Sequence, residues 1–300
     1  MGASIHMNGL IFPGQGSQSI GMGRELYESN LVAKRLLDKA NIIMDYDLKD
    51  LMFNGPEEKL TDTLFAQPAI YTCSAMYMEI VRNLSIDYSY VAGHSLGEYS
   101  ALYAAGVFDF ETGFNLVKAR AESMSQMNGK GIMAAIMGLN EEELAPYMVD
   151  DAVMANLNSR TQIVISGTKS AVEEVCEKVE SLDGVKVRRL SVSAAFHSPQ
   201  MQETEEIMRK LIEATEFRKP SCKVISNVTG RTTEDAQEIK DNLIAQITGQ
   251  VRWFDTIMEM KTCGVDFLYE VGNGEVLRKM TKAITLRPRC KAVEVRVNGI

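Results

Sequence analysis

Apolar residues recur along the chain with two spacings, one typical of buried strands and one typical of helices. The apolar run 10–12 stops at Pro13-Gly14, as expected for a strand that ends in a tight turn, and a second strand is predicted over 88–92. Pro68 suits the first turn of a helix, so a helix is predicted to begin there. The helices predicted in this part of the chain are 31–44, 68–84, 96–105 and 110–126. Because strands and helices alternate, the pattern favours a parallel α/β sheet.

The order of the elements changes after Gly129-Lys130-Gly131. From there the pattern predicts strand 131–138, helix 140–149, strands 152–157 and 162–166, helix 169–182 and strand 185–192. This βαββαβ order is that of the ferredoxin-like unit. The α/β alternation then resumes, with helices predicted over 199–215, 235–247, 253–263 and 274–284 and strands over 222–228, 266–271 and 291–297. We therefore predict an α/β large domain, residues 8–128 and 194–300, that carries an inserted small domain, residues 129–193.

The composition is that of an ordinary globular protein. Of 300 residues, 45% are hydrophobic and 24% are charged, which excludes a disordered or collagen-like chain. The net charge of −8 argues against nucleic-acid binding by the whole molecule. No apolar run approaches the ~18–20 residues that span a bilayer, and the N-terminus lacks the pattern of a secretory signal. We therefore expect a protein that binds neither nucleic acid nor membrane.

The cysteines indicate the compartment. Five are scattered along the chain, and none forms a Cys-x-x-Cys pair. They are Cys73, Cys176, Cys222, Cys263 and Cys290. Because an odd, scattered set suits neither a disulfide framework nor a zinc cluster, we expect a reducing, cytoplasmic setting and no bound metal.

The strongest chemical signal is the pentapeptide Gly93-His94-Ser95-Leu96-Gly97, a G-x-S-x-G pattern between a predicted strand and a predicted helix. In that context a sharp turn lifts the serine hydroxyl above the sheet edge, and the helix N-terminus offers free N–H groups to a developing oxyanion. The alternative is a chance match, since glycine and serine are common in turns. The strand–helix context favours Ser95 as a nucleophile.

A serine hydroxyl needs a base that removes its proton. Only three histidines are present, and His6 lies in residues 1–6, which we interpret as a remnant of expression. His94 adjoins Ser95, and a neighbouring side chain on a tight turn normally points elsewhere. His197 follows a predicted strand and precedes a helix, so it can reach Ser95 across the domain junction. A lone histidine is more often structural, but scarcity favours His197 as the base.

Two further features admit both a functional and a plain structural interpretation. The loop 13–18 follows the first strand, but Ser19 stands where a dinucleotide-binding loop has its third glycine. We interpret this segment as a loop near Ser95 that lends a backbone N–H to an oxyanion hole, the alternative being a simple glycine turn. Arg120 lies on the predicted helix after Ser95, where most arginines are solvated, and pattern alone does not single it out.

Together these residues resemble the malonyl-CoA:acyl carrier protein transacylases of dissociated fatty-acid synthesis. The shared motifs occur in the family's order and span nearly the whole chain from Asn8 onward. They are Phe12–Gln18, Gln67-Pro68-Ala69, Gly93–Ala101, Arg120, Asn156-Leu157-Asn158, Phe196-His197-Ser198 and Glu270-Val271-Gly272. The resemblance implies a hydrolase-like α/β domain with an inserted ferredoxin-like domain. It also implies transfer of a malonyl group from malonyl-CoA to the phosphopantetheine thiol of acyl carrier protein, through a malonyl-serine ester and with no permanently bound cofactor.

The resemblance assigns roles residue by residue. Ser95 takes the malonyl group and His197 is the general base, later the acid. The backbone N–H groups of Gln15 and Leu96 form the oxyanion hole, and Arg120 pairs with the malonyl carboxylate. The residues expected to orient these groups or to border the pocket are His94, Phe196, Gln246, Asn156, Asn158 and Gln67. Gln246 is expected to orient His197 through its main-chain carbonyl.

Three departures or variable positions bear on this assignment. Phe196 before the catalytic histidine is like that of malonyl-selective members, whereas methylmalonyl users tend to carry a smaller serine there. The residue after the serine, Leu96 rather than a glutamine, also resembles that of malonyl-selective members. The segment 249–253 differs from the family's more frequent Asn-Pro-Val-x-Trp, which bears on the details of the Gln246 loop.

Local charge must decide where an acidic carrier protein meets a chain that is itself acidic. The first basic cluster contains Arg278, Lys279, Lys282, Arg287, Arg289, Lys291 and Arg296, against Glu294 alone. The second contains Lys186, Arg188 and Arg189. We expect one of them to steer the carrier toward a monomeric enzyme, the alternative being that both are simply solvated faces.

Two other classes of protein share parts of this pattern. A serine esterase or thioesterase of the α/β-hydrolase type also has G-x-S-x-G, but it places its histidine late in the chain, and no histidine follows His197. A non-catalytic binding module that retains the fold is the other alternative. The combination of nucleophile, base and carboxylate anchor favours the transferase.

Overall fold

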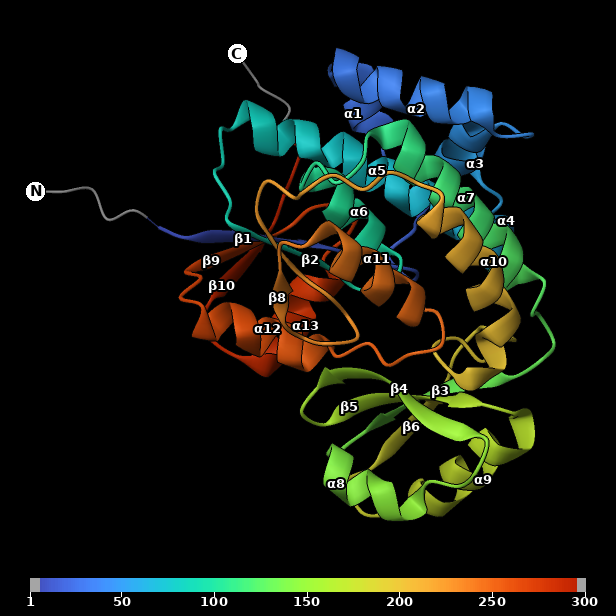
Figure 1. Ribbon diagram of the computed structural model, residues 1–300. Helices are drawn as coiled ribbons and strands as arrows, with labels where there is room; N and C mark the ends of the chain where they lie inside the picture. The colour runs from blue at the N-terminus through green and yellow to red at the C-terminus, as the bar shows by residue number, and fades with distance from the viewer. Residues whose placement is uncertain (1–5, 296–300) are drawn as a thin grey trace, which may run out of the picture.

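The computed structural model describes residues 6–295 and contains two sheets, each with its own helices (Figure 1). The larger sheet has six strands in the order β10-β9-β1-β2-β7-β8. Its strands are β1 (Asn8–Phe12), β2 (Tyr90–Gly93), β7 (Lys223–Ile225), β8 (Thr232–Thr233), β9 (Phe267–Glu270) and β10 (Arg289–Ala292). All neighbours pair in parallel except β7 and β8. The predicted parallel α/β sheet is thereby confirmed.

Helices cover both faces of the larger sheet. Figure 1 shows α5, α6 and α7 above it and α12 and α13 below it. The helices around this sheet are α1 (Arg24–Ser29), α2 (Leu31–Ile43), α3 (Leu48–Asn54), α4 (Glu57–Thr61), α5 (Thr63–Asn83), α6 (Gly97–Ala104), α7 (Phe110–Ser125), α10 (Gln202–Glu213), α11 (Ala236–Ala245), α12 (Trp253–Thr262) and α13 (Val276–Ile284). The sheet is therefore a middle layer between two helical layers.

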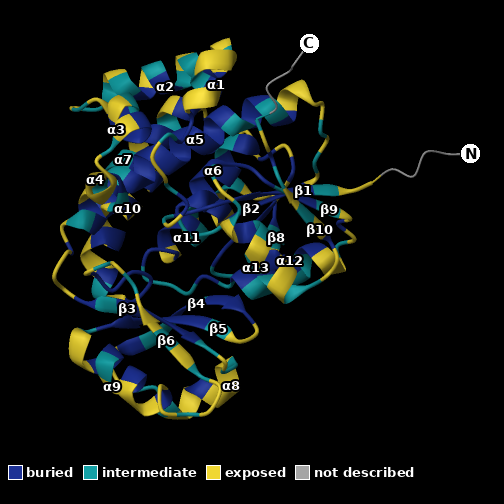
Figure 2. Cartoon of the chain, turned by 180° about the vertical axis from the view of Figure 1, so that it is seen from behind, coloured by how far each residue is buried: buried dark blue, intermediate teal, exposed yellow. Residues whose placement is uncertain are grey.

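The central strand β1 is apolar from Leu10 to Phe12 because both of its faces are buried there. Leu10 and Phe12 belong to the hydrophobic cluster that contains the residues of α5 and α6, whereas Ile11 packs in a separate cluster with Trp253. All of these side chains are buried (dark blue in Figure 2). This two-sided burial explains why the sequence shows a continuous apolar run rather than an alternation of apolar and polar residues.

The smaller sheet is antiparallel and is covered by helices on one face only. Its strands are β3 (Ile132–Met137), β4 (Ala152–Ser159), β5 (Gln162–Gly167) and β6 (Lys186–Arg189), in the order β4-β5-β3-β6. Its helices are α8 (Glu141–Leu144) and α9 (Lys169–Val179), on the side away from the larger sheet (Figure 1). Ala134 and Ile136 pack toward α9, whereas Met133 and Ala135 belong to the cluster of the large sheet. This order of strands is that of the βαββαβ unit.

Strand β4 joins the smaller sheet to the segment that precedes α12. The N–H of Leu157 donates to the carbonyl oxygen of Val251 over 2.9 Å, and the N–H of Val251 donates to that of Ala155 over 2.8 Å. These main-chain bonds hold the polar end of β4 next to the carboxyl ends of β1 and β2. The end of β4 therefore contributes to whatever site lies at that edge.

The observed elements differ from the predicted ones mainly where local caps decide the boundaries. The helix expected to begin at Pro68 begins at Thr63, because the Asp62 side chain accepts from the N–H of Leu64 and caps it. The helix expected over 140–149 ends at Leu144 and continues only as a 3-10 turn that contains Pro146. The short helices α1, α3 and α4 and the two-residue strand β8 were not predicted.

The last predicted strand, 291–297, is observed over 289–292, and its final residues together with Arg296 lie outside the described residues. Within residues 6–295, none of the helices combines the length and the apolar character needed to cross a membrane.

Candidate active site

Ser95 lies on a tight turn between β2 and α6, with a left-handed φ of 54°. The glycines on either side allow this turn. A Cβ on Gly93 would collide with the carbonyl of Gly97, and a Cβ on Gly97 would collide with the carbonyl of Phe12 at the end of β1. The G-x-S-x-G spacing is therefore a steric requirement of packing α6 onto the ends of two strands.

Hydrogen bonds from two distant segments hold the strained main chain of Ser95. Its N–H donates to Oδ1 of Asn227 over 2.8 Å, and its carbonyl oxygen accepts from Nε2 of Gln246 over 2.9 Å. Asn227 also donates from Nδ2 to the carbonyl oxygen of Gly93. Sequence reasoning missed Asn227, although a polar residue within the predicted strand 222–228 was a signal that this strand ends near the same edge of the sheet.

His197 is placed to accept the proton of Ser95. Its Nε2 lies 2.7 Å from Oγ of Ser95, and its Nδ1 lies 2.8 Å from the main-chain carbonyl oxygen of Gln246. Because a carbonyl oxygen can only accept, Nδ1 carries the proton and Nε2 has a free lone pair. The imidazole is thus oriented by a neutral main-chain group and faces the serine hydroxyl.

Burial keeps the His197 imidazole neutral. The side chain is almost fully enclosed, with 4% exposure, and no water can solvate an imidazolium there. Burial, and secondly the charge of Arg120, lower the pKa of His197 to about 3. The ring is therefore in the form that accepts a proton throughout the neutral range.

Arg120 brings a positive charge into the interior beside the serine. It lies on α7 with 1% exposure. Nη1 donates to Oε1 of Gln67 over 2.7 Å, and Nη2 donates to Oε1 of Gln246 over 3.1 Å and to Oγ of Ser95 over 3.3 Å. The buried Nε has no partner among the described residues, and no carboxylate there forms an ion pair with Arg120. A buried guanidinium held only by neutral groups is a site for an anion from outside the chain.

The two predicted oxyanion donors lie at the same corner. The main-chain N–H groups of Gln15 and Leu96 have no acceptor within residues 6–295. The loop 13–18 packs directly on the serine turn, since a Cβ on Gly14 would collide with the carbonyl of His94 and lie 3.6 Å from N of Leu96. This close approach leaves two free N–H groups beside Ser95, where negative charge would develop on the oxygen of a carbonyl group that Ser95 attacks.

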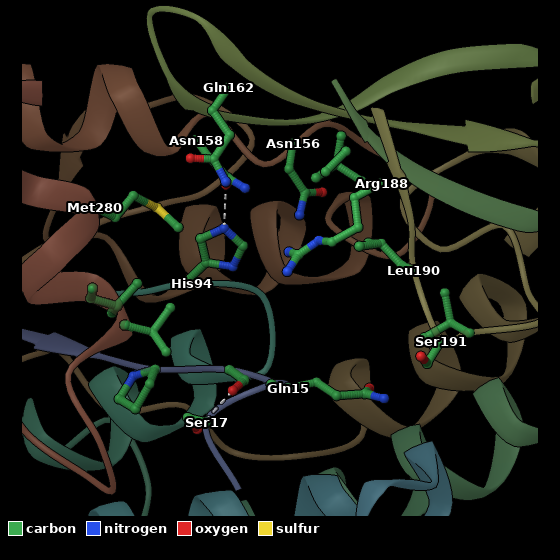
Figure 3. Close-up of a pocket in the computed structure, with 18 of the residues that line it drawn as sticks. Gln15, Ser17, His94, Asn156, Asn158, Gln162, Arg188, Leu190, Ser191 and Met280 are labelled. Atoms are coloured by element: carbon green, nitrogen blue, oxygen red, sulfur yellow. Dashed lines mark hydrogen bonds between the residues drawn. The ribbon is translucent and has the colours of Figure 1, made fainter. Parts of the chain in front are cut away.

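A cavity of about 560 Å³ opens beside this corner, between the two sheets (Figure 3). The loop 13–18, His94, the end of β4 and Met280 of α13 line it. Asn156 points into the cavity from β4, and its Oδ1 is buried without a partner among the described residues. Arg188 of β6 also extends into the cavity. The lining thus offers a basic group and an unpaired amide to a polar, elongated ligand.

His94 connects the serine turn to the smaller sheet. Its Nε2 lies 2.6 Å from Oδ1 of Asn158 (dashed line in Figure 3), so Nε2 carries the proton in this contact. Burial lowers the pKa of His94 as well. Its ring centroid lies 5.4 Å from that of Trp253, and the contacts with Asn158 and Trp253 fix the position of the ring.

The other residues that the sequence analysis expected at the site lie close to Arg120 and His197. Gln67 of α5 receives the Nη1 bond of Arg120 and donates to the sulfur of Met124. Phe196 is buried in the hydrophobic cluster of the large sheet, next to His197. Glu98, which sequence reasoning did not single out, is buried three residues after Ser95 and receives a hydrogen bond from Gln246.

Comparisons with known proteins agree with this arrangement. The family model "Acyl transferase domain" matches residues 10–272. Malonyl CoA-acyl carrier protein transacylase of Synechocystis sp. is 41% identical over 91% of this chain and 92% of its own, and its crystal structure superposes with a TM-score of 0.90 at 37% identity, covering 96% and 97% of the two chains. The polyketide biosynthesis malonyl CoA-acyl carrier protein transacylase PksC of Bacillus subtilis is 42% identical over 89% of this chain and 93% of its own. The transacylase in the complex PlMCAT:AntF, with a type II PKS acyl-carrier protein, has a TM-score of 0.90 at 34% identity and 96% coverage of both chains.

The two histidines near Ser95 should be neutral in opposite tautomers. We expect His197 to carry its proton on Nδ1 and to remain neutral from pH 7 down to pH 5, because burial lowers its pKa to about 3. We expect His94 to carry its proton on Nε2 and to take up a second proton only at a lower pH than an ordinary histidine, because burial lowers its pKa as well. Nitrogen-15 NMR of histidine-labelled protein distinguishes these states, and the variants His94→Gln and His197→Gln assign the signals. An imidazolium spectrum for His197 at pH 6, or a proton on its Nε2, would contradict the hydrogen-bond geometry described here.

Proposed function

The chain belongs to the acyl transferase family and, within it, to the malonyl-CoA:acyl carrier protein transacylases, and from this we propose that it moves a malonyl group through an ester on Ser95. The donor is malonyl-CoA, and the acceptor is the phosphopantetheine thiol of acyl carrier protein. One observation carries this proposal: the guanidinium of Arg120 is buried without a carboxylate partner among the described residues, 3.3 Å from the hydroxyl of Ser95. In a malonyl thioester one CH2 group separates the carboxylate from the reacting carbonyl carbon. The carboxylate can therefore reach the guanidinium of Arg120 while Oγ of Ser95 attacks that carbon.

In the first half-reaction, Oγ of Ser95 attacks the thioester carbon while Nε2 of His197 takes the hydroxyl proton. The negative charge that forms on the carbonyl oxygen faces the free N–H groups of Gln15 and Leu96. The C–S bond then breaks, the CoA sulfur takes the proton from His197, and the malonyl ester of Ser95 remains.

The second half-reaction is the reverse with a different thiol. Nε2 of His197 takes the proton of the phosphopantetheine thiol, and the sulfur attacks the ester carbon. When the C–O bond breaks, the proton returns to Oγ of Ser95. The carbonyl of Gln246 stabilises the transient imidazolium through Nδ1 in both halves.

Arg120 selects the diacid because its charge has no other partner. A malonyl carboxylate gains charge-assisted hydrogen bonds, whereas an acetyl group leaves the buried guanidinium unpaired. One hydrogen bond to a charged group contributes about 1.5–3 kcal/mol, or roughly 10- to 150-fold in rate preference. A planar guanidinium suits this task because it holds a carboxylate with two parallel bonds.

The carrier protein is expected to dock at the mouth of the cavity, on the face of β6. Lys186 and Arg188 are alternate residues of that exposed strand and share one face. Arg189, on the other face, is paired with Glu173 and Glu180. Neither Lys186 nor Arg188 has an acidic partner among the described residues. An acidic partner therefore finds two unpaired cations next to the route to Ser95.

The first basic cluster is less well placed for this role. Arg278 and Lys279 share Glu275 as an acidic partner. Arg289 begins β10, in register with Phe267 at the start of β9. Because the strands are parallel, Arg287 and Arg289 lie at the amino edge of the sheet, opposite the edge that carries Ser95.

Malonyl-CoA alone should convert the protein to a stable ester on Ser95. Intact-mass spectrometry should show one added malonyl group on the natural chain and on the control Ser100→Ala, which changes a buried serine of the helix that follows Ser95, and none on Ser95→Ala. His197→Ala should load more slowly by orders of magnitude. Addition of a pantetheine thiol should discharge the ester as malonyl thioester. Rapid hydrolysis that releases malonate in the absence of a thiol would instead favour an esterase. Formation of a malonyl ester on Ser95→Ala would refute the assignment of Ser95 as the nucleophile.

Removal of the guanidinium should change substrate preference. For Arg120→Ala we expect kcat/KM for malonyl-CoA to fall by about 100-fold or more, since the bonds to a charged group are lost. Turnover of acetyl-CoA, which makes no such bonds, should fall far less. Parallel loss with both substrates would show that Arg120 has only a structural role.

Charge reversal should show which basic cluster the carrier uses. We expect Lys186→Glu with Arg188→Glu to raise the KM for acyl carrier protein about tenfold at low salt, with the difference shrinking as salt is added. The matched pair Arg287→Glu with Arg289→Glu changes the net charge equally at the opposite edge of the sheet and should leave this KM within about twofold of the natural value. If the KM for acyl carrier protein instead rises with Arg287→Glu and Arg289→Glu and not with Lys186→Glu and Arg188→Glu, the carrier docks on the first cluster.

A further inference from the structure

A buried carboxyl group lies behind the catalytic residues without touching the reacting atoms. Glu98 is in the first turn of α6, three residues after Ser95, with 2% exposure. Its Oε2 accepts from Nε2 of Gln246 over 2.6 Å, and its Oε1 accepts from the N–H of Asn227 over 3.2 Å. The two residues that it holds are the same two that hold the main chain of Ser95.

The side-chain amide of Gln246 must be held in one of two orientations. In the observed orientation its Oε1 faces Nη2 of Arg120, 3.1 Å away. Its Nε2 faces three acceptors: Oε2 of Glu98 at 2.6 Å, the carbonyl oxygen of Ser95 at 2.9 Å and Oδ1 of Asn227 at 3.1 Å. An exchange of oxygen and nitrogen would place an acceptor against three acceptors and a donor against a guanidinium. The shortest of these bonds, to Glu98, is also the one with a charged acceptor.

The two hydrogen bonds to Glu98 are those of a carboxylate. Both partners are N–H donors, so each carboxyl oxygen must accept, and a neutral amide in its place offers only one acceptor. Burial raises the pKa of Glu98 to about 8, and the N–H donors and the charge of Arg120 oppose that shift only in part. The carboxylate is therefore the prevailing form of Glu98 above about pH 8. A chain of two hydrogen bonds therefore runs from the carboxylate through the Gln246 amide to the guanidinium.

We propose that Glu98 is a positioning residue that fixes the amide of Gln246, and through it the guanidinium of Arg120, in the arrangement that prefers malonyl over acetyl groups. The inference rests on the proposed function, because it takes the malonyl carboxylate as the ligand of Arg120. It assigns to Glu98 no proton transfer and no contact with substrate. Its effect is on which acyl group is accepted.

The test replaces the carboxylate by an amide of the same shape. In Glu98→Gln the new NH2 group opposes either Gln246 or Asn227, so the Gln246 amide loses or weakens its shortest hydrogen bond and is held less firmly by the bonds to Ser95, Asn227 and Arg120 that remain. We expect kcat/KM for malonyl-CoA to fall about 10- to 100-fold, as for one charge-assisted hydrogen bond, and kcat/KM for acetyl-CoA to fall much less, so that the malonyl-to-acetyl ratio falls at least about fivefold. Glu98→Asp retains the charge on a shorter side chain that cannot reach both donors, and should lower the ratio as well.

The matched control is Glu79→Gln, which changes another buried carboxyl group, on α5, paired with Arg82. It should leave the ratio unchanged, and thermal unfolding followed by circular dichroism verifies that all variants are folded at the assay temperature. If Glu98→Gln does not fold, Gln246→Ala removes the same bond from its other end and should lower the ratio too. A folded Glu98→Gln or Gln246→Ala variant with the natural ratio would overturn the inference.

A double-mutant cycle tests the route through Gln246. In the Gln246→Ala background, which retains the main-chain carbonyl for His197, Glu98→Gln should change the ratio by less than about twofold. Additive effects of the two substitutions would refute the positioning role. Failure of the natural protein to form a malonyl ester would instead refute the proposed function, so the two failures are distinguishable.

Discussion

The interior of this protein is arranged around one unpaired positive charge. Placing the guanidinium of Arg120 in the interior is costly unless its hydrogen bonds are satisfied, and the chain satisfies those of Nη1 and Nη2 with neutral groups: the amides of Gln67 and Gln246 and the hydroxyl of Ser95. Nε has no partner among the described residues. These neutral groups come from α5, from the end of α11 and from the turn before α6. Three segments that are far apart in the sequence therefore meet at the Arg120 side chain. Because these three partners are neutral, the charge of Arg120 remains free to bind the carboxylate of the proposed substrate.

The parallel sheet explains why these parts can meet. Strands β1, β2, β7 and β9 all end at one edge, and the segments that follow them supply the loop 13–18, the serine turn, Asn227 and the start of α13. The smaller sheet then closes this edge with the polar end of β4, whose Asn158 contacts His94. The cavity is lined by residues from the ends of both sheets, which is why its lining is drawn from so many distant segments.

What the sequence could predict depended on the range of the interaction. The serine turn was predictable because its glycines and its strand–helix context are local, and His197 because a three-histidine chain offers few bases. Arg120 was found only through the family resemblance, since a buried arginine on a helix has the same local pattern as a solvated one. Asn227 and Glu98 were missed because their roles rest on contacts across more than 100 residues, with Ser95 and Gln246 respectively. The start of α5 was misplaced because Pro68 outweighed the Asp62 cap. One-dimensional spacing also could not show that Arg289 lies at the start of β10, at the amino edge of the sheet.

The same charge also explains why His197 is oriented by a carbonyl rather than by a carboxylate. The group on Nδ1 is the main chain of Gln246, and the side chain of that residue contacts Arg120. An aspartate at this place would stabilise the imidazolium more strongly, but it would lie next to the guanidinium and pair with it. If Arg120 binds the malonyl carboxylate as we propose, such a pair would compete with that carboxylate and reduce the preference for malonyl groups. The acid that the site does contain, Glu98, is separated from Arg120 by the Gln246 amide, so it can orient that amide without forming an ion pair with the guanidinium. A neutral partner for His197 and an acid kept apart from Arg120 are therefore both consistent with the proposed selection of a diacid in this protein.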